Sequence, residues 1–331
     1  MRKKQNMLIE FLGRLFFIIP STPKFAQIEI TNKCNLNCKM CPRKFLNIPY
    51  KNMNIEVYKT IINNLDGVHT LTLTGWGEPF CYPEIFDCIQ YAKKKGFKIK
   101  LTTNGTLLDN KKIEKIFEKG LDEITFSIDN IQGNATFGHS NLIALRNIQK
   151  IIELRKKKNL DKPKIVLQPT MHAGRAKDIY DIIKWGKKAE VDRINIARIS
   201  TKFDPNLSRV SEEEEKEIFN TANKLSKKLG IRVDMVQYAV FEGFLRYIYI
   251  LFRRIMHRFD SKCSKTYDFI YVNADGFVTP CCMFPNMKMG DLKKNTLNEI
   301  WNGKTFNEFR KNQEKICGNC DVMKIGFLGK R

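Results

Sequence analysis

The sequence predicts an α/β protein in which a partial (β/α)6 TIM-like barrel precedes a small cysteine-rich C-terminal domain. Between residues 25 and about 200, short segments rich in Ile, Val and Thr alternate with longer segments of helical periodicity. This alternation is typical of parallel strands joined by crossover helices. Glycine and polar residues follow several strand segments, where α/β barrels place their chemistry. Five of the ten cysteines lie beyond residue 262 and form a second, separate group.

Each element is predicted from its apolar period and its first or last residues. Leu142, Leu145, Ile148 and Ile152, for example, fall on one face of a helix. Strands are expected at 25–31, 69–75, 98–105, 123–129, 164–170 and 193–200, and a further strand-like segment at 232–238. Helices are expected at 54–65, from Pro83, from Asp109, around 142–152, at 177–188, at 211–230 and from near Thr296. Six βα units therefore end at about Ser200.

We expect four parts: an N-terminal amphipathic segment (1–24), the barrel (25–205), a helical linker or docking segment (206–260) and the cysteine-rich domain (261–331). In the first part, Glu10 and Arg14 interrupt the apolar run, which is shorter than the roughly 20 residues that cross a bilayer. This segment is expected to cap the open end of the barrel or to lie on a membrane surface. The aromatic and basic stretch 241–259 is expected to dock between domains or to make a second membrane contact.

The composition restricts the class of partner and the compartment. The net charge is +23, mostly from lysine, but no RNA-binding signature accompanies it, so no specific nucleic-acid partner is expected. Ten cysteines in 331 residues are too sparse for a disulfide scaffold, and their grouping indicates metal ligation. We therefore expect a cytoplasmic protein, and leave peripheral membrane contact open.

Cys34, Cys38 and Cys41 form a C-x3-C-x2-C run in the loop after the first strand. Three thiolates can hold one corner of a [4Fe-4S] cluster and leave one iron open. A structural zinc loop or packed core thiols are the alternatives, although zinc usually takes four ligands. The spacing, the preceding strand and Met40 resemble the signature loop of the radical S-adenosylmethionine (SAM) superfamily. The resemblance implies that the open iron chelates SAM and that one electron from the cluster cleaves SAM to a 5'-deoxyadenosyl radical.

The second strand ends in Thr74-Gly75-Trp76-Gly77-Glu78-Pro79. This segment is similar to the glycine-rich GGEP motif with which the family holds the SAM amino group, and Trp76 stands where a glycine is frequent. Glycine here would let the backbone approach a ligand closely. The resemblance therefore implies that Trp76, Gly77 and Glu78 contact SAM. The alternative is an ordinary glycine turn after a strand, which would have a similar sequence.

Polar residues at later strand ends are the remaining candidates for SAM contacts. Asn104, Ser127 and Asp129 are expected, by the same resemblance, to reach the SAM ribose and carboxylate; ordinary turn chemistry is the alternative. Arg198 could pair with the SAM carboxylate or remain a solvated charge. His172 and Arg198 are the candidate catalytic residues, because a histidine can exchange protons near neutral pH, although an isolated histidine more often has an ordinary structural role.

The C-terminal cysteines follow the pattern Cys263-x12-Gly276-x4-Cys281, then Cys317-x2-Cys320. This resembles the SPASM/Twitch extension of radical SAM enzymes. Within this sequence no cysteine follows Cys320, so the resemblance implies one auxiliary [4Fe-4S] cluster on Cys263, Cys281, Cys317 and Cys320. The adjacent Cys282 leaves open which of the pair is the ligand. A structural zinc site with four thiolates would show the same pattern.

The expected function is a radical SAM oxidoreductase, dehydrogenase-like, that abstracts hydrogen from an organic substrate while the auxiliary cluster assists oxidation. A small polar molecule, a sugar derivative or a glycolipid is the favoured substrate, and a flavodoxin or ferredoxin the expected electron donor. Peptide maturation is the alternative. Enzymes acting on leader peptides often carry an N-terminal recognition domain, and only 24 residues precede the first strand here. An iron-sulfur electron carrier or binding module without catalysis is the alternative of another class.

Overall fold

The computed structural model describes Gly13 and residues 18–133, 141–204, 206–235, 263–317 and 320. The predictions for the rest of the N-terminal segment and for the docking stretch 241–259 lie outside the described residues. None of the described helices combines the length and the hydrophobicity of a membrane-crossing helix.

The described strands form one sheet in the order β11-β10-β9-β1-β2-β3-β4-β5-β7-β6, with β8 also paired to β7. Neighbours from β9 through β8 run parallel, as predicted for βα units. The barrel strands are β1 Phe25–Ile28, β2 Thr70–Thr72, β3 Lys98–Thr103, β4 Glu123–Ser127, β5 Lys164–Gln168, β6 Thr170–Met171, β7 Arg193–Arg198 and β8 Val233–Met235.

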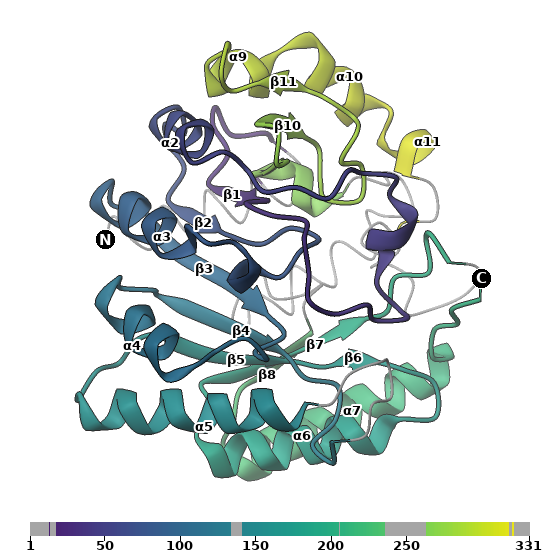
Figure 1. Ribbon diagram of the computed structural model, residues 1–331. Helices are drawn as coiled ribbons and strands as arrows, with labels where there is room; N and C mark the ends of the chain where they lie inside the picture. The colour runs from purple at the N-terminus through teal and green to yellow at the C-terminus, as the bar shows by residue number, and fades with distance from the viewer. Residues whose placement is uncertain are drawn as a thin grey trace.

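Helices follow these strands in the predicted alternation and lie along the outer side of the curved sheet (Figure 1). Their starts are determined locally, because Asn54, Asp109 and Ser211 each accept backbone N–H groups of the first helical turn. The helices are α2 Ile55–Asn63, α3 Ile85–Lys94, α4 Asn110–Glu118, α5 Leu142–Lys157, α6 Ala176–Ala189 and α7 Glu212–Leu229, with the 3-10 helices η1 Pro42–Phe45 and η2 Pro79–Cys81 in loops. The predicted α/β fold with six βα units is confirmed.

The strands of the cysteine-rich region continue the sheet of the barrel. Strand β9 (Phe269–Val272) runs parallel to β1, with Phe25 opposite Phe269 and Ile28 opposite Val272. Strands β10 (Phe277–Thr279) and β11 (Gly290–Asp291) extend this edge in antiparallel fashion. The remaining elements are η4 Ser264–Tyr267, α9 Leu297–Asn302, α10 Lys304–Lys311 and α11 Gln313–Cys317, and Figure 1 shows α9 and α10 beside this edge of the sheet.

One hydrophobic core spans both regions. Barrel residues such as Ile28, Leu71 and Phe126 are fully buried in the same cluster as Trp301 and Phe306 of the C-terminal helices. The indole of Trp301 also donates a hydrogen bond to the Pro20 carbonyl (2.8 Å), just before β1. Because the C-terminal helices pack on the start of β1, the second cysteine group is held next to the strand that leads into the first.

Candidate functional site

The first cysteine group lies in the loop from Thr31 to Cys41, at the carboxyl end of β1. The Arg43 guanidinium stabilises this loop, because it donates hydrogen bonds to the carbonyls of Leu36 (2.9 Å) and Asn32 (3.4 Å). The Cys41 amide donates to the Cys38 carbonyl (3.0 Å), which brings the ends of the C-x2-C pair together. The loop is therefore shaped by its own backbone and by one nearby arginine.

The pKa values of two thiols in this loop are raised. Burial, and then the charges of Cys41 and Cys34, raise the pKa of Cys38 to about 11, while burial raises the pKa of Cys34. Thiols with raised pKa values become thiolates only against a strong positive charge, which bound iron supplies. Within the described ranges no three His, Cys, Asp or Glu side chains are placed to hold a single metal ion. Three partly exposed neighbouring thiols suit one corner of an iron-sulfur cluster.

Gly77 is needed because the loop after β2 lies directly against the cysteine loop. A Cβ atom at Gly77 would lie 2.5 Å from the carbonyl oxygens of both Thr31 and Lys33. The next residue, Glu78, donates its amide to the Lys33 carbonyl (2.8 Å). Gly77 thus makes room for the backbone that carries the cysteines, and its contact with SAM stays a prediction.

The buried Glu78 side chain joins the same loop to the end of β3. Its carboxylate accepts hydrogen bonds from the Thr103 hydroxyl (2.6 Å), the Asn104 amide (2.8 Å) and the Phe80 amide (3.2 Å). Burial raises the pKa of Glu78 to about 7 although these donors oppose the rise. The carboxylate thus positions two loops that face the cysteines.

Asn104 reaches back to the cysteine loop. Its side-chain amide donates to Asn35 Oδ1 (3.0 Å), and its Oδ1 accepts from the Thr106 amide (2.9 Å). Asn35 in turn donates to the Thr106 hydroxyl (2.9 Å). Sequence reasoning predicted Asn104 as a site residue but did not predict Asn35 or Thr106. The one feature that could have indicated these two is their position in loops that follow strands.

The other candidates lie at the same edge of the sheet. Ser127 is the last residue of β4, is partly exposed and stands opposite Gln168. Asp129 is buried, accepts from the Thr170 amide (3.0 Å), and has its pKa raised to about 6 by burial. Met40 is partly exposed beside Cys41. The structure therefore gathers the strand-end candidates at the edge that carries the cysteine loop.

The side chains of Arg198 and His172 are largely buried within the protein. The Arg198 guanidinium donates from Nε to both carboxylate oxygens of Glu215 (2.8 and 3.0 Å), and a further contact from Nη2 completes the pair. Burial, together with the Arg175 charge, lowers the pKa of His172 to about 4. His172 is therefore neutral near pH 7, which suits a hydrogen-bonding role better than that of a general acid.

The second cysteine group comes together from four places in the C-terminal region. Cys263 precedes η4, Cys281 follows β10, Cys317 ends α11 and Cys320 follows it. Burial, with the Cys263 and Cys320 charges, raises the pKa of Cys317 to about 12. Burial also raises the pKa of Cys281, whose charged neighbours include Cys263 and Cys320. Cys263 and Cys320 thus affect the pKa values of both Cys281 and Cys317, and one four-ligand site on these cysteines stays a prediction.

Cys282 faces the barrel. Burial raises the pKa of its thiol, and Lys265, Glu29 and Cys320 are its next electrostatic neighbours. Its carbonyl accepts a hydrogen bond from the Trp76 indole (2.9 Å). Trp76 therefore bridges the loop after β2 and the second cysteine group.

Glu29 is a site residue that sequence reasoning missed. Its Oε2 accepts from the Trp76 amide (3.0 Å) and from the Tyr271 hydroxyl (2.7 Å). Gly75 permits this arrangement, because a Cβ atom there would lie 2.2 Å from Glu29 Cγ. The sequence does place this carboxylate between two apolar residues, Ile28 and Ile30, at the end of a predicted strand. A charged residue in such a position can indicate a buried, functional side chain.

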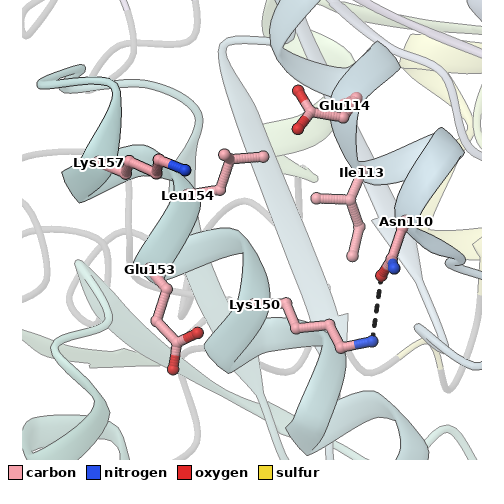
Figure 2. A pocket seen from close by; sticks show the side chains of 7 residues that line it. All are labelled: Asn110, Ile113, Glu114, Lys150, Glu153, Leu154 and Lys157. Carbon is pink, nitrogen blue, oxygen red and sulfur yellow. Dashed lines mark hydrogen bonds between the residues drawn. The ribbon is translucent and has the colours of Figure 1, made fainter.

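Two grooves among the described residues can be compared with the position of the cysteines. One, of about 430 Å³, lies between the segment after the cysteine loop and the segment after Cys282, and is lined by Phe45, Leu46, Phe203, Met283, Phe284, Pro285, Asn286 and Met287. The other, of about 320 Å³, lies between α4 and α5 on the helical layer and has a Lys150 to Asn110 hydrogen bond (3.1 Å) at one end (Figure 2). The second groove is lined by residues of α4 and α5 alone, whereas the lining of the first groove includes Met283, the residue after Cys282.

Comparison with known proteins decides the family. Residues 28–199 match the family described as the radical SAM superfamily, and residues 263–321 match the SPASM iron-sulfur cluster-binding domain. The chain belongs to the radical SAM superfamily. Its radical SAM domain binds a [4Fe-4S] cluster and SAM, and its SPASM domain binds auxiliary iron-sulfur clusters, as the resemblance of the motifs implied.

Two curated relatives and one solved structure illustrate the similarity. The AdoMet-dependent heme synthase of Methanosarcina barkeri is 25% identical over 337 residues, covering 92% of this chain and 90% of the relative. The tungsten-containing aldehyde ferredoxin oxidoreductase cofactor-modifying protein of Pyrococcus furiosus is 26% identical over 183 residues, which span 53% of this chain and about half (51%) of that relative. SuiB of Streptococcus suis bound to S-adenosylmethionine has a TM-score of 0.71 at 16% identity, covering 98% of this chain and 77% of that one, and shares the fold.

Proposed function

We propose that this radical SAM enzyme is a dehydrogenase-like oxidoreductase that abstracts a hydrogen atom from an organic substrate and uses one auxiliary [4Fe-4S] cluster to assist the oxidation. The observation that carries the proposal is the hydrogen bond from Trp76 to the Cys282 carbonyl, because it joins the SAM-motif loop to the auxiliary cysteines. The pairing of β1 with β9 supports the same closeness. The bound cofactors would supply the electron and the radical chemistry.

Each cysteine set then has a role that its surroundings support. Cys34, Cys38 and Cys41 would hold the SAM-binding cluster, in the loop that Arg43 and Glu78 position. Cys263, Cys281, Cys317 and Cys320 would hold the auxiliary cluster, with Cys281 favoured over Cys282 because its charged neighbours include both Cys263 and Cys320.

The groove beside the two cysteine groups would receive the substrate. Its lining is aromatic and methionine-rich, and a hydrogen bond between the two walls runs from the Asn286 side chain to the Leu46 carbonyl (3.5 Å). Pockets of this kind bind ligands by apolar contact with few polar groups. Among the favoured classes, a glycolipid or another molecule with an apolar part therefore fits better than a free sugar. Contact with a membrane surface would follow from such a substrate.

A tetrapyrrole is the second candidate substrate. The M. barkeri relative, named an AdoMet-dependent heme synthase, aligns with 92% of this chain. A tetrapyrrole also has a large apolar face, which the aromatic lining of the same groove would suit.

A flavodoxin or ferredoxin would donate the electrons. Such carriers present acidic surfaces, and the net charge of +23 would favour their encounter with this enzyme.

Iron content and SAM cleavage test the proposal. Anaerobically reconstituted protein should bind about eight irons, as two [4Fe-4S] clusters require. The triple variant Cys34→Ala, Cys38→Ala, Cys41→Ala should retain about four irons and form no 5'-deoxyadenosine with dithionite. Retained cleavage of SAM in that variant would contradict the central assignment.

The double variant Cys317→Ala, Cys320→Ala separates the auxiliary site from cofactor cleavage. It should keep about four irons and still form 5'-deoxyadenosine with dithionite. Zinc in place of the second four irons in the native protein would show that the C-terminal site is structural and that the proposed auxiliary role is wrong.

A further inference from the structure

Lys202 has an ammonium group buried at the carboxyl end of the barrel. It follows β7, and its Nζ atom has no hydrogen-bond partner among the described residues. The Phe284 ring covers this atom, with 3.6 Å between Nζ and the ring centroid. A cation–π contact alone is weak compensation for removing an ammonium group from water, so a buried charge of this kind indicates an anionic partner.

The ring that covers Lys202 belongs to the segment of the auxiliary cysteines. The Phe284 amide donates a hydrogen bond to the Cys281 carbonyl (3.2 Å), which closes the turn that begins at Cys281. The segment after β7 therefore places the buried Lys202 ammonium group against the turn that carries Cys281 and Cys282.

We propose that Lys202 is the internal counter-ion of the auxiliary cluster, where its ammonium group stabilises the reduced state and raises the reduction potential. The inference rests on the proposed function, since it requires a redox-active cluster on the C-terminal cysteines. Four thiolates make the site anionic, and reduction by one electron adds one more negative charge. A nearby buried cation opposes that charge strongly because little water screens it.

The chain supplies a matched control in Lys265. It stands two residues after Cys263, so it also lies near the site, but its side chain is exposed to solvent. Water and salt screen an exposed charge, so its effect on the cluster is expected to be small. Comparison of the two lysines separates a buried counter-ion from a general effect of positive charge.

The test is a redox titration of the auxiliary cluster alone. Full-length protein carrying the Cys34→Ala, Cys38→Ala, Cys41→Ala changes is reconstituted anaerobically, and its remaining cluster is titrated with dithionite and mediators under EPR detection. Lys202→Met and Lys202→Gln should shift the midpoint potential to more negative values. Lys202→Arg should stay near the parent, and Lys265→Met should shift it much less.

The midpoint potentials and the iron contents of these variants either support or overturn the role of Lys202. An unchanged potential in an iron-loaded neutral variant, or equal shifts for Lys202→Met and Lys265→Met, would overturn the inference. Loss of iron from both neutral variants but not from Lys202→Arg would support it, because the cation would then be needed to hold the cluster. Loss of iron from all three would overturn it in favour of a packing role. Absence of iron from the triple-cysteine parent would instead refute the auxiliary cluster of the proposed function, and this inference with it.

Discussion

The Tyr271 hydroxyl donates a hydrogen bond to Glu29 Oε2 over 2.7 Å and so links the C-terminal strand β9 to the first strand of the barrel. The same oxygen accepts the Trp76 amide. Glu29 is only 2% exposed, so these donors replace water around a buried carboxylate. One side chain therefore orients the strand that leads into the cysteine loop, the SAM-motif loop and the SPASM region.

Tyr271→Phe should lower the free energy of unfolding by about 1.5–3 kcal/mol, the range for a hydrogen bond to a charged group. The remaining donors leave the carboxylate only partly satisfied. Chemical denaturation of the anaerobic holoprotein measures the change. Tyr91→Phe is the control, because that hydroxyl bonds to Asn63 at an exposed position (3.1 Å), and its loss should change stability by about 0.5 kcal/mol or less. Equal losses of stability in the two variants would mean that the hydrogen bond to Glu29 stabilises the protein no more than an exposed one.

Gly77→Ala should displace the cysteine loop, since the new Cβ would lie 2.5 Å from two loop carbonyl oxygens. We expect lower iron retention at the first site and lower SAM affinity, measured by iron determination and calorimetry. Gly96→Ala is the control. Gly96 has a positive φ but nothing within 4 Å of its Cβ position, so the cost there is backbone strain alone, and both clusters should remain. Full iron and unchanged SAM affinity in Gly77→Ala would show that the two loops are not packed as described.

Glu215→Gln should destabilise the protein by about 3–5 kcal/mol, because it leaves the Arg198 charge buried without its carboxylate. The two side chains are 10% and 9% exposed. Glu190→Gln removes an exposed pair with Lys156 that water and salt screen, so it should leave the stability nearly unchanged. SAM affinity of folded Arg198→Gln then tests the predicted cofactor contact: an unchanged value removes Arg198 from the SAM site.

Stability should increase with pH between about 4 and 6.5 because of His172. Its pKa in the folded state is about 4, below the ordinary value of 6.5. The unfolded chain therefore binds more protons over this window, and the stability is lost as the pH falls through it. His172→Gln should flatten the dependence by up to about 1.4 kcal/mol per pH unit. His69→Gln, at an exposed position, should leave the slope as it is; a similar flattening in both variants would argue against buried His172 as the source.

Local features of the chain were sufficient to predict most of the fold. The βα alternation, the helix-capping residues such as Asn54 and Asp109, and the C-x3-C-x2-C loop all depend on neighbours a few residues apart. The roles of Gly75 and Gly77 could not be predicted in the same way. Their constraint comes from Glu29 and from the cysteine-loop backbone, which lie more than 40 residues earlier in the chain.

The amino-acid sequence by itself determined the α/β class, both cysteine sets and the superfamily, because strand period, helix period and ligand spacing are properties of short segments. Only the tertiary structure decided that β9 extends the barrel sheet at β1, that Trp76 bonds to the Cys282 carbonyl, and that the Lys202 ammonium group is buried against Phe284. These relationships all join residues more than 80 positions apart in the chain. Packing of a shared core brings them together, and no local pattern encodes which surfaces meet.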